Sequence, residues 1–398
     1  MPTDPPAFRS DLPHSFPWSV FHRRHPALVT QLLDVVPYGP AQRAAVRDLL
    51  VESTTGVLEP LGEHAPDHAQ WLAWGGRELY GRPWGEAPFL WAESYFYRRL
   101  LEATGYFRPG AWQGVDPFAP LKNAELAGPE VDGELAALDG LSELPDERRA
   151  AALLAAALWG NRADLSFRLQ PPAAGTGTAG APPSGLLVDH GPLLWSTLAA
   201  ASSPRVCLIA DNAGRELLPD LVLLDHLLAG GLAAEAVLYV KPHPYYVSDA
   251  TTTDVLAAVE RLYAAPGPQA ALTGRRLRRA LTTGALTLRT HPFFCAPLPF
   301  HDLPADLRTE LSGAALTILK GDLNYRRLVG DRPWPATTAF AAAVGHFPSP
   351  VAALRTLKSE VVVGLEAPVV AALDATGTPW RTGGTHALIQ VHHPAGTR

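Results

Sequence analysis

An aspartate and an asparagine, Asp211 and Asn212, stand together directly after a short apolar run at 205–210. Their side-chain oxygens are hard ligands, suited to Mg²⁺ or Mn²⁺. Asp249 supplies a second carboxylate that could complete a set around one cation. Gly214 permits a tight turn, and the N–H groups of a following helix would attract an anion. The same residues also suit an ordinary turn with a helix cap, so the pattern alone leaves both interpretations open.

Lysines that could bind a phosphate occupy similar positions in the chain. Only four of the 33 basic residues are lysine, and a compact ammonium cannot be exchanged for arginine's planar fork at a tight site. Three of the four, Lys241, Lys320 and Lys358, fall in segments that follow or precede predicted strands. The run at 320–326 adds a glycine and further polar groups, which could form a phosphate cradle. An ordinary charged loop is the alternative interpretation of that run.

Strand and helix patterns alternate from about residue 186 onward. Apolar runs predict buried strands at Arg205–Ala210, Ala236–Val240, Leu286–Thr290, Leu316–Leu319 and Val361–Val363. Helices are predicted between them, at about Glu216–Ala229 and Thr252–Ala264. This alternation indicates an α/β fold with a largely parallel sheet flanked by helices, in three layers α/β/α. Ligands bind such sheets beyond the carboxyl ends of the strands, which is where the polar residues above lie.

The chain divides by pattern into two regions. Residues 1–150 predict a mostly helical, aromatic-rich N-terminal region, and residues 151–398 predict an α/β metal- and phosphate-binding domain. Helical spacing is seen at Ala41–Glu52, Phe89–Leu101 and Pro145–Trp159. The stretch 170–185 predicts a flexible surface loop. It contains a G-x-G-x-x-G pattern, but the prolines around it argue against a dinucleotide-binding turn.

Composition narrows the class of protein. The 398 residues are 47% hydrophobic and 18% charged, as in a globular protein with a substantial core. The net charge of −6 argues against a nucleic-acid surface but permits a small anionic substrate. We expect no membrane span and no signal peptide, because no apolar stretch of the required kind occurs. Two cysteines, Cys207 and Cys295, cannot make a disulfide framework, so we expect a cytoplasmic setting.

Five segments, taken together and in this order, resemble the damage-control phosphatase family, formerly a domain of unknown function. They are GNRADLS at 160–166, DNAGRE at 211–216, KPHPYYVSD at 241–249, KGDLNYR at 320–326 and RTLK at 355–358. The resemblance extends from about residue 15 to 365. The branch of the family with an RTxK motif includes proteins once described as acidic-residue protein methyltransferases.

The resemblance implies a role for each matching residue. Asp211, Asn212 and Asp249 would be catalytic and would bind a divalent metal, Mn²⁺ or Ni²⁺ foremost and Co²⁺ or Mg²⁺ otherwise. The family pattern places Glu216, Asp322, Leu323, Asn324, Tyr325, Arg326 and Lys358 at the substrate. We add Lys241 and Lys320 to the substrate-binding set as cations for the phosphate. The implied reaction is hydrolysis of small phosphorylated metabolites, sugar phosphates such as fructose 1-phosphate or fructose 6-phosphate.

Two other functions remain open from the sequence. An S-adenosylmethionine-dependent protein carboxyl methyltransferase would follow the older description of the relatives, but such enzymes commonly have a glycine-rich turn where this chain has Asp211 and Asn212. A sugar-phosphate-binding protein without turnover could share the same binding residues. For a phosphatase, the attacking group is either water or the Asp211 carboxylate. We favour water, because this aspartate is already committed to the metal.

Overall fold

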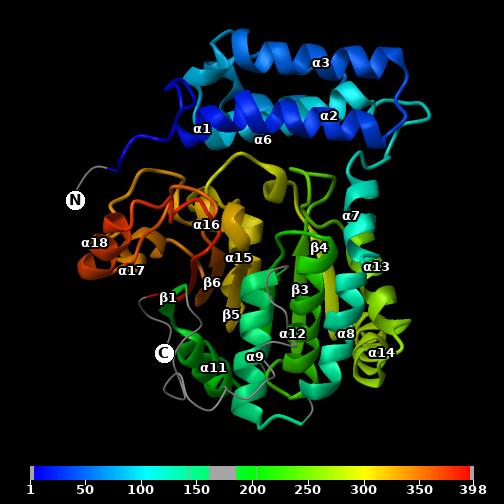
Figure 1. Ribbon diagram of the computed structural model, residues 1–398, viewed down its shortest axis with the longest axis vertical. Coiled ribbons are helices and arrows are strands. Elements are labelled where there is room, and N and C mark those ends of the chain that lie inside the picture. The colour runs from blue at the N-terminus through cyan, green and yellow to red at the C-terminus, as the bar shows by residue number, and fades with distance from the viewer. Residues whose placement is uncertain (1–3, 142, 161–184, 203, 395–398) are drawn as a thin grey trace.

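A seven-stranded sheet forms the centre of the chain, in the order β1-β7-β6-β5-β2-β3-β4 (Figure 1). The computed structural model describes residues 4–141, 143–160, 185–202 and 204–394. The strands are β1 (Leu186–Asp189), β2 (Arg205–Ile209), β3 (Glu235–Val240), β4 (Leu286–Thr290), β5 (Leu316–Lys320), β6 (Val351–Thr356) and β7 (Ala387–His392). The neighbouring strands from β6 to β4 are parallel, whereas β7 is antiparallel to β6 and carries β1 alongside it in parallel. The predicted largely parallel sheet is confirmed.

The carboxyl ends of the parallel strands meet at one edge of the sheet. Ile209 of β2 pairs with Tyr239 of β3 on one side and with Leu319 of β5 on the other. Lys320, at the end of β5, pairs in turn with Leu354 near the end of β6. The segments that follow these strands are therefore brought to the same edge, although they are far apart in the sequence.

Helices cover both faces of the sheet, because successive residues of each buried strand face opposite cores. Val206 and Leu208 of β2 belong to one apolar cluster, and Cys207 and Ile209 belong to the other. The first cluster includes residues of α8 (Pro129–Leu141), α9 (Asp146–Trp159), α11 (Gly191–Ala200), α12 (Leu217–Ala229), α13 (Thr252–Tyr263) and α14 (Pro268–Thr283). The second includes residues of α15 (Ala305–Ser312), α16 (Gly321–Val329) and α17 (Phe340–Val344), and α18 (Ala367–Ala375) packs against it. This arrangement confirms the three-layer α/β/α fold.

The N-terminal helices form a separate layer, drawn blue at the top of Figure 1. Its helices are α1 (Phe16–Ser19), α2 (His25–Val35), α3 (Pro40–Thr55), α4 (His68–Trp71), α5 (Arg77–Leu79) and α6 (Phe89–Thr104). They bury their own aromatic-rich core, whose residues run from Val20 to Phe118. Helix α7 (Ala119–Leu126) leads from this layer to the sheet domain, and α8 and α9 already pack on the sheet. The change of core falls along α7, because Phe118 just before it belongs to the N-terminal core and Leu126 at its end packs against the core of the sheet domain. The division at residue 150 stays a prediction.

The layer is fastened to the sheet domain by polar contacts near the carboxyl edge. The Tyr245 hydroxyl, in the loop after β3, donates a 2.6 Å hydrogen bond to Ser94 of α6. The Arg326 guanidinium of α16 lies 2.9 Å from the carboxylate of Glu93, also on α6. These contacts place the helical layer over the edge at which the strands end.

One predicted strand is wrong. Val361–Val363 is an irregular segment rather than a strand, although all three valines are buried in the core. Side chains satisfy its backbone, since Tyr325 and Gln390 hydrogen-bond with Val363. A buried loop of this kind has the same apolar composition as a strand. The actual strand is β6, which contains the first two residues of the RTLK motif, and β1 and β7 had not been predicted.

Residues 170–184 of the predicted flexible loop lie outside the described part of the chain. Within the described ranges, no helix is both long and apolar enough to cross a lipid bilayer.

Candidate active site

The three predicted metal ligands lie together beyond the ends of β2 and β3. The segments 211–213 and 248–250 run antiparallel to each other, joined by backbone hydrogen bonds of 2.6 and 2.8 Å. Asn212 stands opposite Asp249 in this short antiparallel backbone pairing. Two loops that are separated in the sequence by α12 and β3 therefore bring Asp211, Asn212 and Asp249 together.

The Asn212 side chain organises the first of these loops. Its amide nitrogen donates to Glu216 at 2.7 Å and to Asp211 at 3.3 Å. Its Oδ1 atom accepts a 2.7 Å hydrogen bond from the Ser248 hydroxyl. Because an amide oxygen has two lone pairs, Oδ1 keeps one for a cation.

Asp249 contributes a buried carboxylate oxygen to this cluster. The residue is 4% exposed, and its Oδ2 atom is buried without a hydrogen-bond partner among the described residues. The Lys241 ammonium lies 3.3 Å from this oxygen and makes an ion pair with it. A buried carboxylate oxygen that receives no hydrogen bond from the described residues is costly, and a metal ion would satisfy it.

The electrostatics of the two carboxylates point the same way. Burial raises the pKa of Asp211 well above its usual value, and the neighbouring Asp249 and Glu216 carboxylates raise it further. Burial also raises the pKa of Asp249, to about 6, although Lys241 opposes this. Two adjacent carboxylates, one buried and one partly buried, disfavour each other's charge, and a divalent cation between them would remove that penalty. The set therefore fits a hard divalent cation.

The set differs from a site built only of acidic, histidine and cysteine ligands. No cluster of three or more His, Cys, Asp or Glu side chains suited to a metal occurs among residues 4–141, 143–160, 185–202 and 204–394. Here one of the three candidate ligands is the amide of Asn212. All three would offer hard oxygen atoms, the ligands that Mg²⁺ and Mn²⁺ prefer.

Gly321 allows the backbone of α16 to approach this cluster. Its φ of +83° suits glycine, and a Cβ at this position would lie 1.7 Å from Asp211 Oδ2. No side chain can be accommodated at that distance. Two features therefore require a glycine at position 321: its positive φ and its close contact with Asp211.

Lys358 and Glu216 lie next to the proposed ligands. The Lys358 ammonium is 3.5 Å from Glu216 Oε1, and the lysine side chain is 46% exposed. Partial burial lowers the pKa of Lys358, but Glu216 and Asp211 outweigh it, so the pKa is raised. The lysine is therefore a charged, accessible group beside the carboxylates. This is the placement expected for a residue that meets an anionic substrate.

Asp322 holds the RTLK segment in place. Its Oδ1 atom accepts hydrogen bonds from Arg355 at 2.8 Å, from Ser359 at 3.1 Å and from the Lys358 backbone N–H at 3.2 Å. Burial opposes its ionisation, yet Arg355 and Arg326 lower the pKa of Asp322. Asp322 thus fixes the backbone from which Lys358 extends.

Two further predicted lysines are engaged with acidic partners. Lys320 is buried and makes an ion pair with Asp220. It nevertheless helps to line a small cavity together with Asp211, Asn212 and Glu216. Lys241 is buried beside Asp249, as described above. Each lysine therefore lies at the edge of the cluster with its charge already paired.

The side chains of 323–326 are buried and are held by partners outside this cluster. Leu323 packs in a small apolar cluster with Leu90, Tyr245 and Cys295. The Asn324 amide donates to the carbonyl oxygens of Ala210 and Lys320, the Tyr325 hydroxyl to Gln390, and Arg326 to Glu93 and Asp331. The structure thus gives this run interior contacts, and its role in substrate binding stays a prediction.

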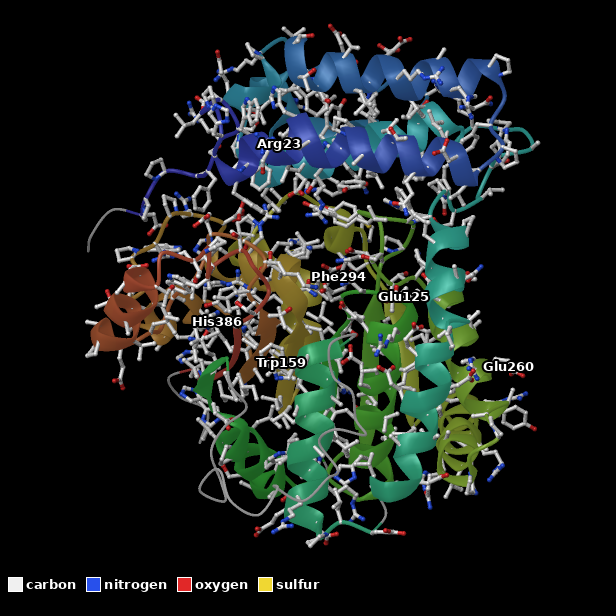
Figure 2. All side chains as sticks on the ribbon, viewed as in Figure 1. Arg23, Glu125, Trp159, Glu260, Phe294 and His386 are labelled. Carbon is white, nitrogen blue, oxygen red and sulfur yellow. The ribbon has the colours of Figure 1, made fainter. Side chains whose placement is uncertain are left out.

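Two residues of α7 at this site had not been predicted. The Glu125 carboxylate lies over the Asp-Asn turn, where a Cβ on Gly214 would come within 2.7 Å of its Oε2 atom. Figure 2 labels Glu125 between α7 and the sheet. Burial raises the pKa of Glu125, and the nearby Glu216 raises it further. The other residue is Lys122, which contacts the Asp249 backbone. The sequence signal that could have identified Lys122 is the small number of lysines in the chain, of which it is one of four.

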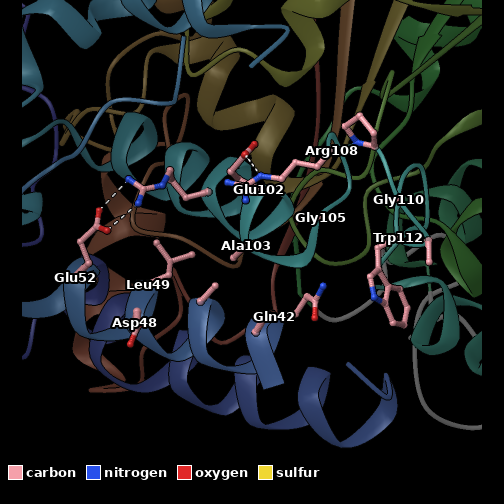
Figure 3. A pocket seen from close by; sticks show the side chains of 15 residues that line it. Gln42, Asp48, Leu49, Glu52, Glu102, Ala103, Gly105, Arg108, Gly110 and Trp112 are labelled. Atoms are coloured by element: carbon pink, nitrogen blue, oxygen red, sulfur yellow. Dashed lines mark hydrogen bonds and ion pairs between the residues drawn. The ribbon is translucent and has the colours of Figure 1, made fainter. Parts of the chain in front are cut away.

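A larger cavity, of about 510 Å³, lies in the N-terminal layer (Figure 3). Four of its charged lining residues form two ion pairs, Arg99 with Glu52 and Arg108 with Glu102. None of the predicted site residues lines it.

This chain is similar to a known protein family over most of its length. The sequence profile described as "Damage-control phosphatase ARMT1-like domain" matches residues 20–373. The chain belongs to the ARMT1-like damage-control phosphatase family. Proteins named Damage-control phosphatase ARMT1 from Danio rerio and Homo sapiens are each 32% identical over 336 and 338 residues, which cover 78% of this chain and 75% and 76% of theirs.

A solved structure of a DUF89 family protein from Pyrococcus horikoshii also aligns, over 93% of this chain and 97% of that one. Its TM-score is 0.47 and its identity 15%. The profile match and the two ARMT1 relatives confirm the predicted family, and membership in it supports a phosphatase activity. Of the GNRADLS segment only Gly160 is described, and a Cβ there would lie 2.8 Å from Glu216 Cγ.

Proposed function

We propose that this ARMT1-like chain is a metal-dependent phosphatase that hydrolyses small phosphorylated metabolites, sugar phosphates such as fructose 1-phosphate or fructose 6-phosphate among them. The observation that carries the proposal is the pair of neighbouring carboxylates, partly buried Asp211 and buried Asp249, which the backbone pairing of Asn212 with Asp249 brings together at the carboxyl edge of the sheet. Membership in a phosphatase family supports the reaction type.

Asp211, Asn212 and Asp249 would hold the cation, which we propose to be Mn²⁺ or Ni²⁺, with Co²⁺ or Mg²⁺ as substitutes. A bound divalent cation polarises a phosphoryl oxygen and offsets its charge. The buried Asp249 oxygen, whose neighbouring cation is the single charge of Lys241, and the raised pKa of Asp211 support this placement. A divalent cation would add the further positive charge that these two carboxylates favour.

The accessible cation Lys358 would bind the phosphate group of the substrate. Its ammonium is tethered near the ligands by Glu216 and by the Asp322 contact to its backbone. Glu216 and Glu125 provide carboxylates that can accept hydrogen bonds from sugar hydroxyl groups. We propose water as the attacking group, because Asp211 serves as a ligand.

The test is phosphate release from a panel of hexose and pentose phosphates by chelator-treated protein, with and without added Mn²⁺. We expect release that depends on the metal. A parallel incubation with labelled S-adenosylmethionine should transfer no methyl group above background. Methyl transfer without phosphate release would favour the methyltransferase. Saturable sugar-phosphate binding without turnover at any metal concentration would favour the binding protein.

We also propose a cytoplasmic setting. Cys207 and Cys295 are both free and buried, as expected for thiols that need no oxidising compartment.

A further inference from the structure

Lys122 of α7 is buried beside the proposed metal site. The residue is 4% exposed, and its ammonium is surrounded by three oxygen acceptors. It donates to the backbone carbonyl of Asp249 at 3.2 Å and lies 2.8 Å from the carboxylates of both Asp116 and Asp254. An ammonium has three N–H donors, so this arrangement uses each of them once.

These contacts connect three parts of the chain. Asp254 belongs to the capping box of α13, in which it accepts hydrogen bonds from the Thr251 N–H at 2.8 Å and from the Thr251 hydroxyl at 2.7 Å. Asp116 precedes α7 in the connection from the helical layer. Lys122 therefore ties the loop that carries Asp249 to both the start of α13 and the N-terminal region.

The Asp249 carboxylate lies beside Lys241 in the cluster, whereas its backbone carbonyl accepts a hydrogen bond from Lys122. The flanking backbone groups are already paired with the 211–213 segment. Lys122 supplies the contact to the Asp249 backbone carbonyl. Arginine could not replace it, because a planar fork does not present three donors from one atom.

We propose that Lys122 is a positioning residue that sets the Asp249 carboxylate for the divalent cation. The proposal rests on the metal site of the proposed function. Residues that orient metal ligands from behind are commonly worth 10- to 100-fold in metal affinity. We therefore expect loss of the Lys122 contact to weaken Mn²⁺ binding by about 10-fold or more. The maximal rate at saturating Mn²⁺ should change much less.

A purely structural role would predict loss of stability without this change in affinity. Lys122→Met alone would leave two carboxylates buried without their cation, which endangers folding. The double variant Lys122→Met/Asp116→Asn removes one of those charges, and Asp254 keeps its hydrogen bonds from Thr251. Asp116→Asn alone is the matched control, because it retains the contact from Lys122 to Asp249.

The experiment is calorimetric titration of the metal-free full-length chain with Mn²⁺, repeated for the double variant and the control. We expect the control to bind within about threefold of the wild type and the double variant to bind about 10-fold or more weakly. Circular dichroism of each protein checks that the fold is retained.

Equal Mn²⁺ affinity in the folded double variant and the control would overturn the positioning role. A double variant that fails to fold while Asp116→Asn folds would overturn it as well, because Lys122 would then act on the fold rather than on Asp249. Absence of Mn²⁺ binding by the wild type would instead refute the metal site of the proposed function.

Discussion

Replacing Lys358 by alanine should weaken the protein's binding of the substrate phosphate group while leaving the fold intact. The side chain is 46% exposed, and its ion pair with Glu216 spans 3.5 Å. An exposed pair of this kind contributes about 0–1 kcal/mol to the free energy of unfolding. A hydrogen bond between this ammonium and a phosphate would be charge-assisted, and its loss costs about 1.5–3 kcal/mol. That corresponds to a fall in kcat/KM of roughly 10- to 150-fold.

The assay is steady-state phosphate release from the best substrate of the panel, with the Tm of each protein measured alongside. Lys358→Arg should restore only part of the activity, since its bulkier fork would displace the phosphate. Arg381→Met is a suitable control, because it breaks a comparable exposed ion pair with Asp374, at 3.2 Å. Wild-type kcat/KM in Lys358→Ala would refute the reasoning, and so would an equal loss in the control.

Two other predictions concern the ligand cluster. Gly321→Ala should abolish most activity and lower the Tm, because its Cβ would lie 1.7 Å from Asp211 Oδ2. Gly377→Ala, which also has positive φ but open space around it, should lower the Tm only slightly and leave kcat unchanged. In metal-free protein the Asp249 carboxyl has a folded pKa of about 6, above its unfolded value near 4. Ionisation therefore costs stability as the pH rises from about 4 to 6, and Asp249→Asn should show a smaller fall in Tm over that range than the wild type. An unchanged pH dependence in that variant would contradict the assignment.

The sequence was sufficient to locate the edge of the sheet at which the candidate site lies. Strands β2, β3 and β5 are buried along almost their whole length and are nearly continuous apolar runs in the sequence, so their carboxyl ends could be identified to within a residue or two. The placement of Asp211 and Lys241 after those ends followed directly. Asp249 required more, because its position depends on the pairing of two loops that the pattern does not reveal.

Long-range ion pairs account for most of what could not be predicted. Lys320 pairs with Asp220 across 100 residues, and Arg326 with Glu93 across 233. Neither partner stands in a motif or at a fixed spacing, so free cations and paired ones look alike in the sequence. Strand β1 was missed for another reason, since it has only four residues and its apolar run at 186–188 is too short to distinguish a strand from a helix segment.

The most direct test of the central claim is a Mn²⁺ titration of phosphate release by chelator-treated wild type and by Asp211→Ala. The account predicts that the wild-type rate rises from background to a plateau as the metal is added. The variant should stay at background throughout while keeping its circular dichroism spectrum. Release that is unaffected by the chelator, or a variant that responds to Mn²⁺ as the wild type does, would contradict it.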